Sequence, residues 1–125
     1  MPDTYPETHP YQPRTHARKD PEAIAYVMCA TDERVTFAQL EARANQGAHL
    51  LRGAGLERGD HIAILMENRR EFLEICFAAD RCGVYYTTIS THLMPDEIAY
   101  ILQDCGARVL ITSDRILDSL GHALP

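Results

Sequence analysis

Aromatic residues are scarce in this sequence: tryptophan is absent, and phenylalanine and tyrosine make up 7% of the 125 residues. Aliphatic side chains must therefore fill most of the core, and a chain of this length supports one modest core. Positive charge is also scarce, since 12 Lys and Arg stand against 18 Asp and Glu and give a formal net charge of -6. Because non-specific nucleic-acid binding requires clustered positive charge, we expect no nucleic-acid partner.

Long hydrophobic runs are missing as well. No apolar stretch reaches the roughly 18 residues that mark a membrane-spanning helix, and the polar, proline-rich start is unlike a secretory signal peptide. The four cysteines show no C-x-x-C spacing, and no pair of histidines lies near them at zinc-binding spacing. Unpaired cysteines of this kind are typical of a reducing compartment. We therefore expect a cytoplasmic protein with no transmembrane segment and no metal site.

The sequence also lacks the common motifs for phosphate binding and nucleophilic catalysis. Neither G-x-x-x-x-G-K-[ST] nor G-x-S-x-G occurs. The run from Gly53 to Gly55 resembles the start of a dinucleotide-binding loop, but it follows a predicted helix, and Arg58 replaces the third glycine. Ser90 and His92 lie close in sequence at a predicted strand end, but no third residue orients a triad. We therefore predict no catalytic residue in this chain.

The first 22 residues differ in composition from the rest. Residues 1–22 contain five of the seven prolines and almost no aliphatic side chains. Because proline removes a backbone donor and disfavours helix interiors, we expect residues 1–22 to form an extended or disordered arm. We expect residues 23–125 to form one incomplete α/β subdomain.

From residue 23 onward, strand patterns alternate with helix patterns. Runs of apolar and β-branched residues predict strands at residues 23–30, 35–37, 61–66, 84–89 and 108–112, and we expect the strand at residues 23–30 to be buried. Apolar spacings of three and four predict helices at residues 37–53, 69–82, 95–105 and 114–120. Their starts are indicated by a capping box at Thr36 and Gln39, by caps at Asn68 and Ser113, and by Pro95 at a first helical position. In the second helix, we expect Phe72, Leu73, Cys76 and Ala79 to face inward. Residues 61–66 are apolar on both faces, which is typical of a parallel sheet covered by helices. We therefore predict an α/β fold in three layers with a largely parallel sheet, opened by a hairpin.

Two short motifs resemble core motifs of the adenylate-forming (AMP-binding) enzyme superfamily. VTFAQL at residues 35–40 resembles the first motif, and RCGVYYTTIS at residues 81–90 resembles the second, which surrounds a Gly-x-x-Tyr. Residues 55–83 keep the family's spacing, and residues 92–114 look like acyl-CoA synthetases acting on fatty or aryl acids. The order and spacing of these segments carry the resemblance, which covers about residues 21–120.

The resemblance implies the N-terminal fragment of an acyl-CoA synthetase, with the partial subdomain expected above. Such an enzyme joins a small-molecule carboxylic acid to CoA through an acyl-adenylate, and it uses ATP, with Mg²⁺ assisting the first step. In the family, the Ser/Thr/Gly-rich ATP loop and the catalytic lysine come later in the chain. We therefore expect no cofactor held by this fragment alone, no activity from it, and ATP, Mg²⁺ and CoA in the full-length enzyme.

His92 is the one candidate for cofactor binding. In some family members, a basic residue in the loop after the second motif contacts the CoA nucleotide, and His92 occupies the matching place. An imidazole can hydrogen-bond or stack, although it binds phosphate less strongly than arginine does. The alternative is an ordinary loop histidine.

Two other functions fit the same residues. One is an adenylation domain that feeds a carrier protein instead of CoA, and the other is a non-catalytic α/β module for oligomerisation or regulation. Because strands and helices that would cover it are absent from a fragment, we also expect an exposed apolar surface through which the fragment self-associates.

Overall fold

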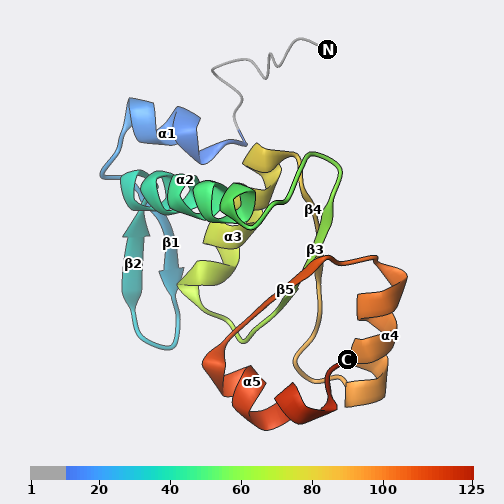
Figure 1. Cartoon of the computed structure of the whole chain (residues 1–125). Helices are drawn as coiled ribbons and strands as arrows, with labels where there is room; N and C mark the ends of the chain where they lie inside the picture. Colours follow the sequence, from blue (N-terminus) through green and yellow to red (C-terminus); the bar gives the residue numbers. More distant parts are fainter. Residues whose placement is uncertain (1–10) are drawn as a thin grey trace. The chain divides into compact units, whose positions relative to one another are not determined.

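The computed structural model describes residues 11–125, and they form two compact units, one ending at Gln46 and the other starting at Gly47 (Figure 1). The helices and strands are α1 (Pro13–Lys19), β1 (Ile24–Met28), β2 (Glu33–Thr36), α2 (Phe37–Gly53), β3 (His61–Leu65), α3 (Arg70–Cys82), β4 (Tyr85–Thr88), α4 (Pro95–Asp104), β5 (Val109–Thr112), α5 (Asp114–Leu120) and a 3-10 turn (Gly121–Ala123). No helix in the described part of the chain is long and apolar enough to cross a membrane. The predicted alternation of strands and helices is confirmed.

The first unit contains the predicted hairpin. Strands β1 and β2 pair antiparallel from Ile24 opposite Thr36 to Met28 opposite Glu33, with an irregularity in register near the start of β1. The prediction that β1 is a buried strand is wrong, because Ile24 and Val27 are exposed. A short apolar run does not distinguish a strand inside a sheet from one in a two-stranded hairpin, where side chains on either face can meet water.

The expected extended or disordered arm is wrong for part of its length, because α1 occupies Pro13–Lys19. Proline at the first helical position costs no hydrogen bond, and no further proline follows until Pro21. The helix is held in part by the ring of His16, which stacks on Phe37 with centroids 4.8 Å apart. The prediction relied on the number of prolines in residues 1–22, although residues 14–20 contain none. Residues 1–10 of the same prediction lie outside the described residues.

The second unit contains a three-stranded parallel sheet in the order β4-β3-β5. Ile62 of the central strand lies opposite Tyr86 of β4 and Val109 of β5. This confirms the largely parallel sheet. Because both pairs are parallel, the carboxyl ends of β3, β4 and β5 lie at one edge of the sheet.

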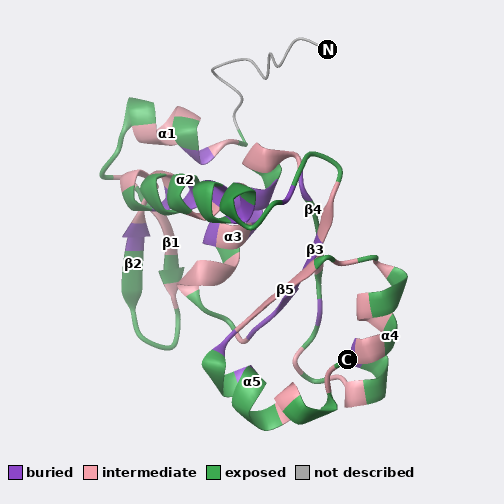
Figure 2. Cartoon of the chain, viewed as in Figure 1, coloured by how far each residue is buried: buried purple, intermediate pink, exposed green. Residues whose placement is uncertain are grey.

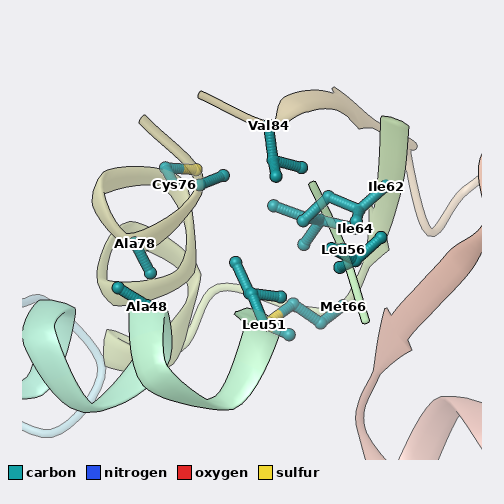
Figure 3. Close-up of a cluster of buried hydrophobic side chains, with 10 residues drawn as sticks. Ala48, Leu51, Leu56, Ile62, Ile64, Met66, Cys76, Ala78 and Val84 are labelled. Atoms are coloured by element: carbon teal, nitrogen blue, oxygen red, sulfur yellow. The ribbon is translucent and has the colours of Figure 1, made fainter. Parts of the chain in front are cut away.

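Side chains of β3 alternate between two hydrophobic clusters, as the apolar run predicted. Ile62, Ile64 and Met66 belong to a cluster that also contains residues of α2 and α3 (Figure 3). Ala63 and Leu65 belong to a second cluster with side chains of α4 and α5. Figure 2 shows the resulting buried stretch along β3. The sheet of this unit is therefore covered by helices on both faces, as the predicted three layers require.

The helix starts agree with the predicted signals at α2, α4 and α5 and differ at α3. At α2, Thr36 and Gln39 exchange the two hydrogen bonds of a capping box, at 3.0 and 3.1 Å. At α4, the backbone N–H of Met94 donates to the carboxylate of Glu97 at 2.8 Å. At α3, however, the N-cap is Arg69 and not the predicted Asn68.

The predicted inward face of α3 is confirmed at Cys76 and Ala79, which are buried, and at Phe72, which packs against the same cluster, but it is wrong at Leu73. Leu73, which we expected to face inward, is 39% exposed, whereas Glu74 is 6% exposed. The buried side chains centre on Ala78 and Ala79, so Leu73 lies on the opposite side of the helix. Burial of the Glu74 carboxylate is compensated in part by Arg70, whose Nε lies 3.8 Å from Glu74 Oε1.

Candidate functional site

A hollow of about 890 Å³ lies at the carboxyl ends of β3 and β4 and beside α5, entirely within the second unit. In parallel α/β sheets, ligands bind beyond this edge, because the loops that follow the strands meet there. We call this hollow the strand-end pocket. Its lining residues are Met66, Glu67, Asn68, Phe72, Thr88, Ile89, Ser90, Thr91, His92, Arg115, Ile116 and Ser119.

The lining divides into an apolar part and a polar part. The apolar side chains include Met66, Ile89 and Ile116, which are all buried. The polar part contains hydroxyl groups, one amide, one carboxylate and two basic side chains. A concave site that presents both apolar and polar side chains suits a small molecule with apolar and polar parts.

His92 lies in the loop between β4 and α4 and lines the strand-end pocket with an exposed side chain. Its backbone N–H donates to Ser90 Oγ at 3.2 Å, and the next N–H, of Leu93, donates to the Ser90 carbonyl at 3.4 Å. Ser90 therefore shapes the turn that carries His92. Its hydroxyl accepts from the main chain of His92, which is a structural role and not the hydroxyl–imidazole pair of a nucleophile.

Glu67 follows β3 directly and joins the strand-end pocket to α5. Ser113 Oγ donates to Glu67 Oε2 at 2.6 Å and accepts the N–H of Ile116 at 3.3 Å, so Ser113 is the helix cap that the sequence predicted. The Ser113 hydroxyl is the main cause that lowers the pKa of Glu67, with smaller contributions from Arg69 and Arg115. A carboxylate that is charged near neutral pH thus ties the end of β3 to the start of α5.

Arg115 is the second basic side chain of the strand-end pocket. It lies in the first turn of α5, is exposed, and precedes the buried Ile116. Sequence reasoning missed both Glu67 and Arg115. A polar residue directly after a buried strand was an available signal for Glu67, but nothing local in the sequence indicated that α5 returns to the end of β3.

The other residues that the sequence singled out lie elsewhere or in structural roles. Within residues 11–125, no three His, Cys, Asp or Glu side chains gather in a way that could hold a metal ion. The four cysteines are free, and only Cys76 is fully buried. Gly53 ends α2 and Gly55 follows it in the left-handed region, which is the helix termination that the sequence indicated. Among the features described, the strand-end pocket is therefore the one whose shape and lining suit a ligand.

Comparisons with known proteins give a family match and several similar relatives. Residues 13–124 match the family described as AMP-binding enzyme. Long-chain-fatty-acid–CoA ligase FadD13 of Mycobacterium tuberculosis is 39% identical over 98 residues, which are 78% of this chain and 20% of that ligase. Gramicidin S synthase 2 of Brevibacillus brevis is 31% identical over 121 residues, which are 95% of this chain and 3% of the synthase.

The fold has a counterpart among solved structures. The inhibitor-bound N-terminal domain of FACL13 from Mycobacterium tuberculosis superposes with a TM-score of 0.78 at 36% identity, covering 87% of this chain and 28% of that domain. In the comparison with FadD13 given above, the chain spans about a fifth of the length of that ligase.

Proposed function

Because this chain belongs to the AMP-binding enzyme family, we propose that it is the N-terminal part of an ATP-dependent acyl-CoA synthetase. In the proposed reaction, a carboxylate oxygen attacks the α-phosphorus of ATP, and the bond to pyrophosphate breaks. The sulfur of CoA then attacks the acyl carbonyl carbon, a thioester forms, and AMP leaves. The similarity to FadD13, a ligase named for long-chain fatty acids and CoA, is the observation that carries the proposal.

We propose that residues 23–125 contribute framework and a binding edge, and that catalysis depends on parts of the enzyme outside them. The described residues do not fit the needs of ATP and Mg²⁺. They contain no glycine-rich phosphate loop and no cluster of three carboxylates or other metal ligands. We therefore assign no step of the reaction to a residue of this chain.

CoA fits the residues present better than ATP does. We propose that His92 contacts the nucleotide part of CoA, since it is exposed and lines a pocket that presents both apolar and polar side chains. In the complete enzyme, His92→Ala should weaken CoA affinity several-fold while leaving the rate of acyl-adenylate formation unchanged. The exposed His49 on α2 provides a matched control, because it does not line the pocket. Unchanged CoA affinity in His92→Ala would exclude this contact.

The proposed activity can be tested by pyrophosphate release from a panel of carboxylic acids with ATP, followed by detection of acyl-CoA. The complete enzyme should give both products, and the 125-residue chain alone should give neither. Turnover by the chain alone would contradict the assignment of catalysis to other parts. No turnover by the complete protein would instead favour the non-catalytic oligomerisation or regulatory module.

A second candidate is an adenylation domain that passes its acyl group to a carrier protein. The similarity to gramicidin S synthase 2, which extends over more of this chain than the similarity to FadD13, favours it. Offering the complete protein CoA and a phosphopantetheine-loaded carrier protein in parallel separates the two. Preferential acylation of the carrier would favour the second candidate.

Two further properties stay predictions. A cytoplasmic location is supported by the four free cysteines. Self-association of the chain is supported by exposed aromatic side chains, including Tyr85 on β4 and Tyr100 on α4. Sedimentation of the purified chain over a concentration series would detect such association.

A further inference from the structure

We propose that Arg115 is a second phosphate-binding residue of the strand-end pocket, which it forms together with His92. This inference rests on the proposed CoA binding and names the group recognised, the phosphate monoester on the adenosine of CoA. The two basic residues are 23 positions apart in the sequence, in the β4–α4 loop and in α5, yet they line one hollow. Hydrogen-bond donors that converge from separate elements suit an anion site.

Arg115 differs from the other arginines around this edge because its guanidinium is not already engaged. Arg69 lies 3.7 Å from Glu67 and 3.3 Å from Glu71, so carboxylates occupy it. Across residues 11–125, Arg115 makes no hydrogen bond or ion pair within 4.0 Å, and its interaction is a longer-range attraction to Glu67. Its donors are therefore available to a ligand.

The Glu67 carboxylate, which also lines the strand-end pocket, does not prevent Arg115 from binding a phosphate. Glu67 accepts the Ser113 hydroxyl at 2.6 Å and is also paired with Arg69. These partners occupy acceptor positions of the carboxylate that Arg115 would otherwise fill. The lowered pKa of Glu67 reflects these partners. A phosphate can therefore compete for Arg115.

The backbone that carries Arg115 is held on both sides. Ser113, two residues earlier, is buried and bonded to Glu67 and to the N–H of Ile116. Ile116, the next residue, is buried in the hydrophobic cluster that includes Ala63 and Leu65. Only the side chain of Arg115 then has to be ordered on binding, which limits the entropic cost.

The chemistry favours a phosphate ester on a partly apolar ligand. A guanidinium presents paired donors that match two phosphate oxygens. His92 can add a further hydrogen bond, and the partly exposed Phe72 offers an aromatic face for a purine ring. Free phosphate would use the basic residues alone, whereas CoA would use both parts of the strand-end pocket.

The test is calorimetric titration of the complete enzyme with CoA, dephospho-CoA and inorganic phosphate. Arg115→Gln should weaken CoA binding about tenfold, as expected for loss of a charge-assisted hydrogen bond, and should change dephospho-CoA binding little. Arg115→Lys should recover part of the loss. Arg52→Gln is the matched control, because Arg52 is exposed in the last turn of α2 and does not line the pocket.

Equal CoA affinity in Arg115→Gln and wild type would overturn the proposal. It would also be overturned if the wild type bound CoA and dephospho-CoA equally well, or if it bound none of the three probes. Phosphate binding that depends on Arg115 without any CoA binding would keep its role as a phosphate ligand and refute the CoA assignment. Acyl-CoA formation by the complete enzyme tests the proposed function separately, so the two failures are distinguishable. Circular dichroism checks that each variant is folded.

Discussion

The two edges of the parallel sheet in the second unit differ in how far their basic side chains are engaged within the fold. At the amino edge, charges pair within the fold: Arg108 Nη1 lies 2.7 Å from Asp60 Oδ2, and that same oxygen accepts the N–H of Glu57 at 2.7 Å. His61 and Tyr85 stack there with centroids 5.0 Å apart. At the carboxyl edge, His92 and Arg115 are exposed around a hollow.

The difference separates residues that hold the sheet together from residues that are free to bind. Hydrogen bonds between Gly59 N–H and the Gly83 carbonyl, and between Tyr85 N–H and the Asp60 carbonyl, both at 2.8 Å, close the amino edge further. Substitutions at this edge should therefore change stability more than ligand affinity. Substitutions of exposed residues at the carboxyl edge should do the reverse.

The largest effect should come from the strand that supports both edges. Ile64 is fully buried in the centre of β3, and Ile64→Ala removes methyl groups and leaves a cavity. We expect the free energy of unfolding to fall by about 3 kcal/mol, as measured by urea denaturation. Leu50→Ala, on the exposed side of α2, is the control and should change it by less than about 0.5 kcal/mol. Similar losses in both variants would show that β3 is not the centre of the core.

A smaller effect confined to the amino edge is expected from Gly83→Ala. Gly83 has a φ of 66°, and an added Cβ would lie 2.7 Å from Arg58 Cγ. Left-handed backbone at a residue with a side chain costs about 1–2 kcal/mol, so stability should fall by roughly that amount. Gly53→Ala, where a Cβ meets nothing within 4 Å, should be neutral. A change in CoA affinity in folded Gly83→Ala would contradict the inference that the amino edge affects stability and the carboxyl edge affects ligand binding.

Glu67→Gln should cost about 1 kcal/mol near neutral pH, because it removes the charge from the hydrogen bond with Ser113. The folded-state pKa of Glu67 is lowered, so its stabilisation is present above the unfolded pKa and is lost as pH falls through the folded pKa. The variant should therefore differ from the wild type at pH 7 and converge with it in acid. Urea midpoints measured at several pH values check this. A difference that grows toward low pH would contradict the assigned sign.

The smallest effect on stability should come from Arg108→Gln, because the arginine side chain is more than half exposed and water screens the pair. Its urea midpoint should fall slightly, and its CoA affinity should equal that of the wild type. Arg115→Gln should show the opposite pattern, with an unchanged midpoint and weaker CoA binding. A loss of CoA affinity in Arg108→Gln would mean that charge at either edge acts on the ligand.

Elements with strong local patterns were predictable from residues close together in the chain. The capping box of Thr36 and Gln39 and the cap at Ser113 follow from side-chain chemistry within three residues. The apolar run of β3 likewise indicated a strand buried on both faces. Helix α1 was not predicted, because residues 1–22 are rich in proline. The run between Pro13 and Pro21, which contains no proline and forms most of the helix, was judged by the composition of the whole stretch.

Local sequence was enough to indicate the alternating α/β order, the parallel sheet and the family resemblance, because periodicity, caps and motif spacing are properties of neighbouring residues. It placed His92 at a strand end, but it could not show what faces His92. Only the folding of α5 back to the end of β3, tied by Ser113 and Glu67, brings Arg115 to the same pocket. That proximity depends on packing across 23 residues of chain, which no local pattern encodes.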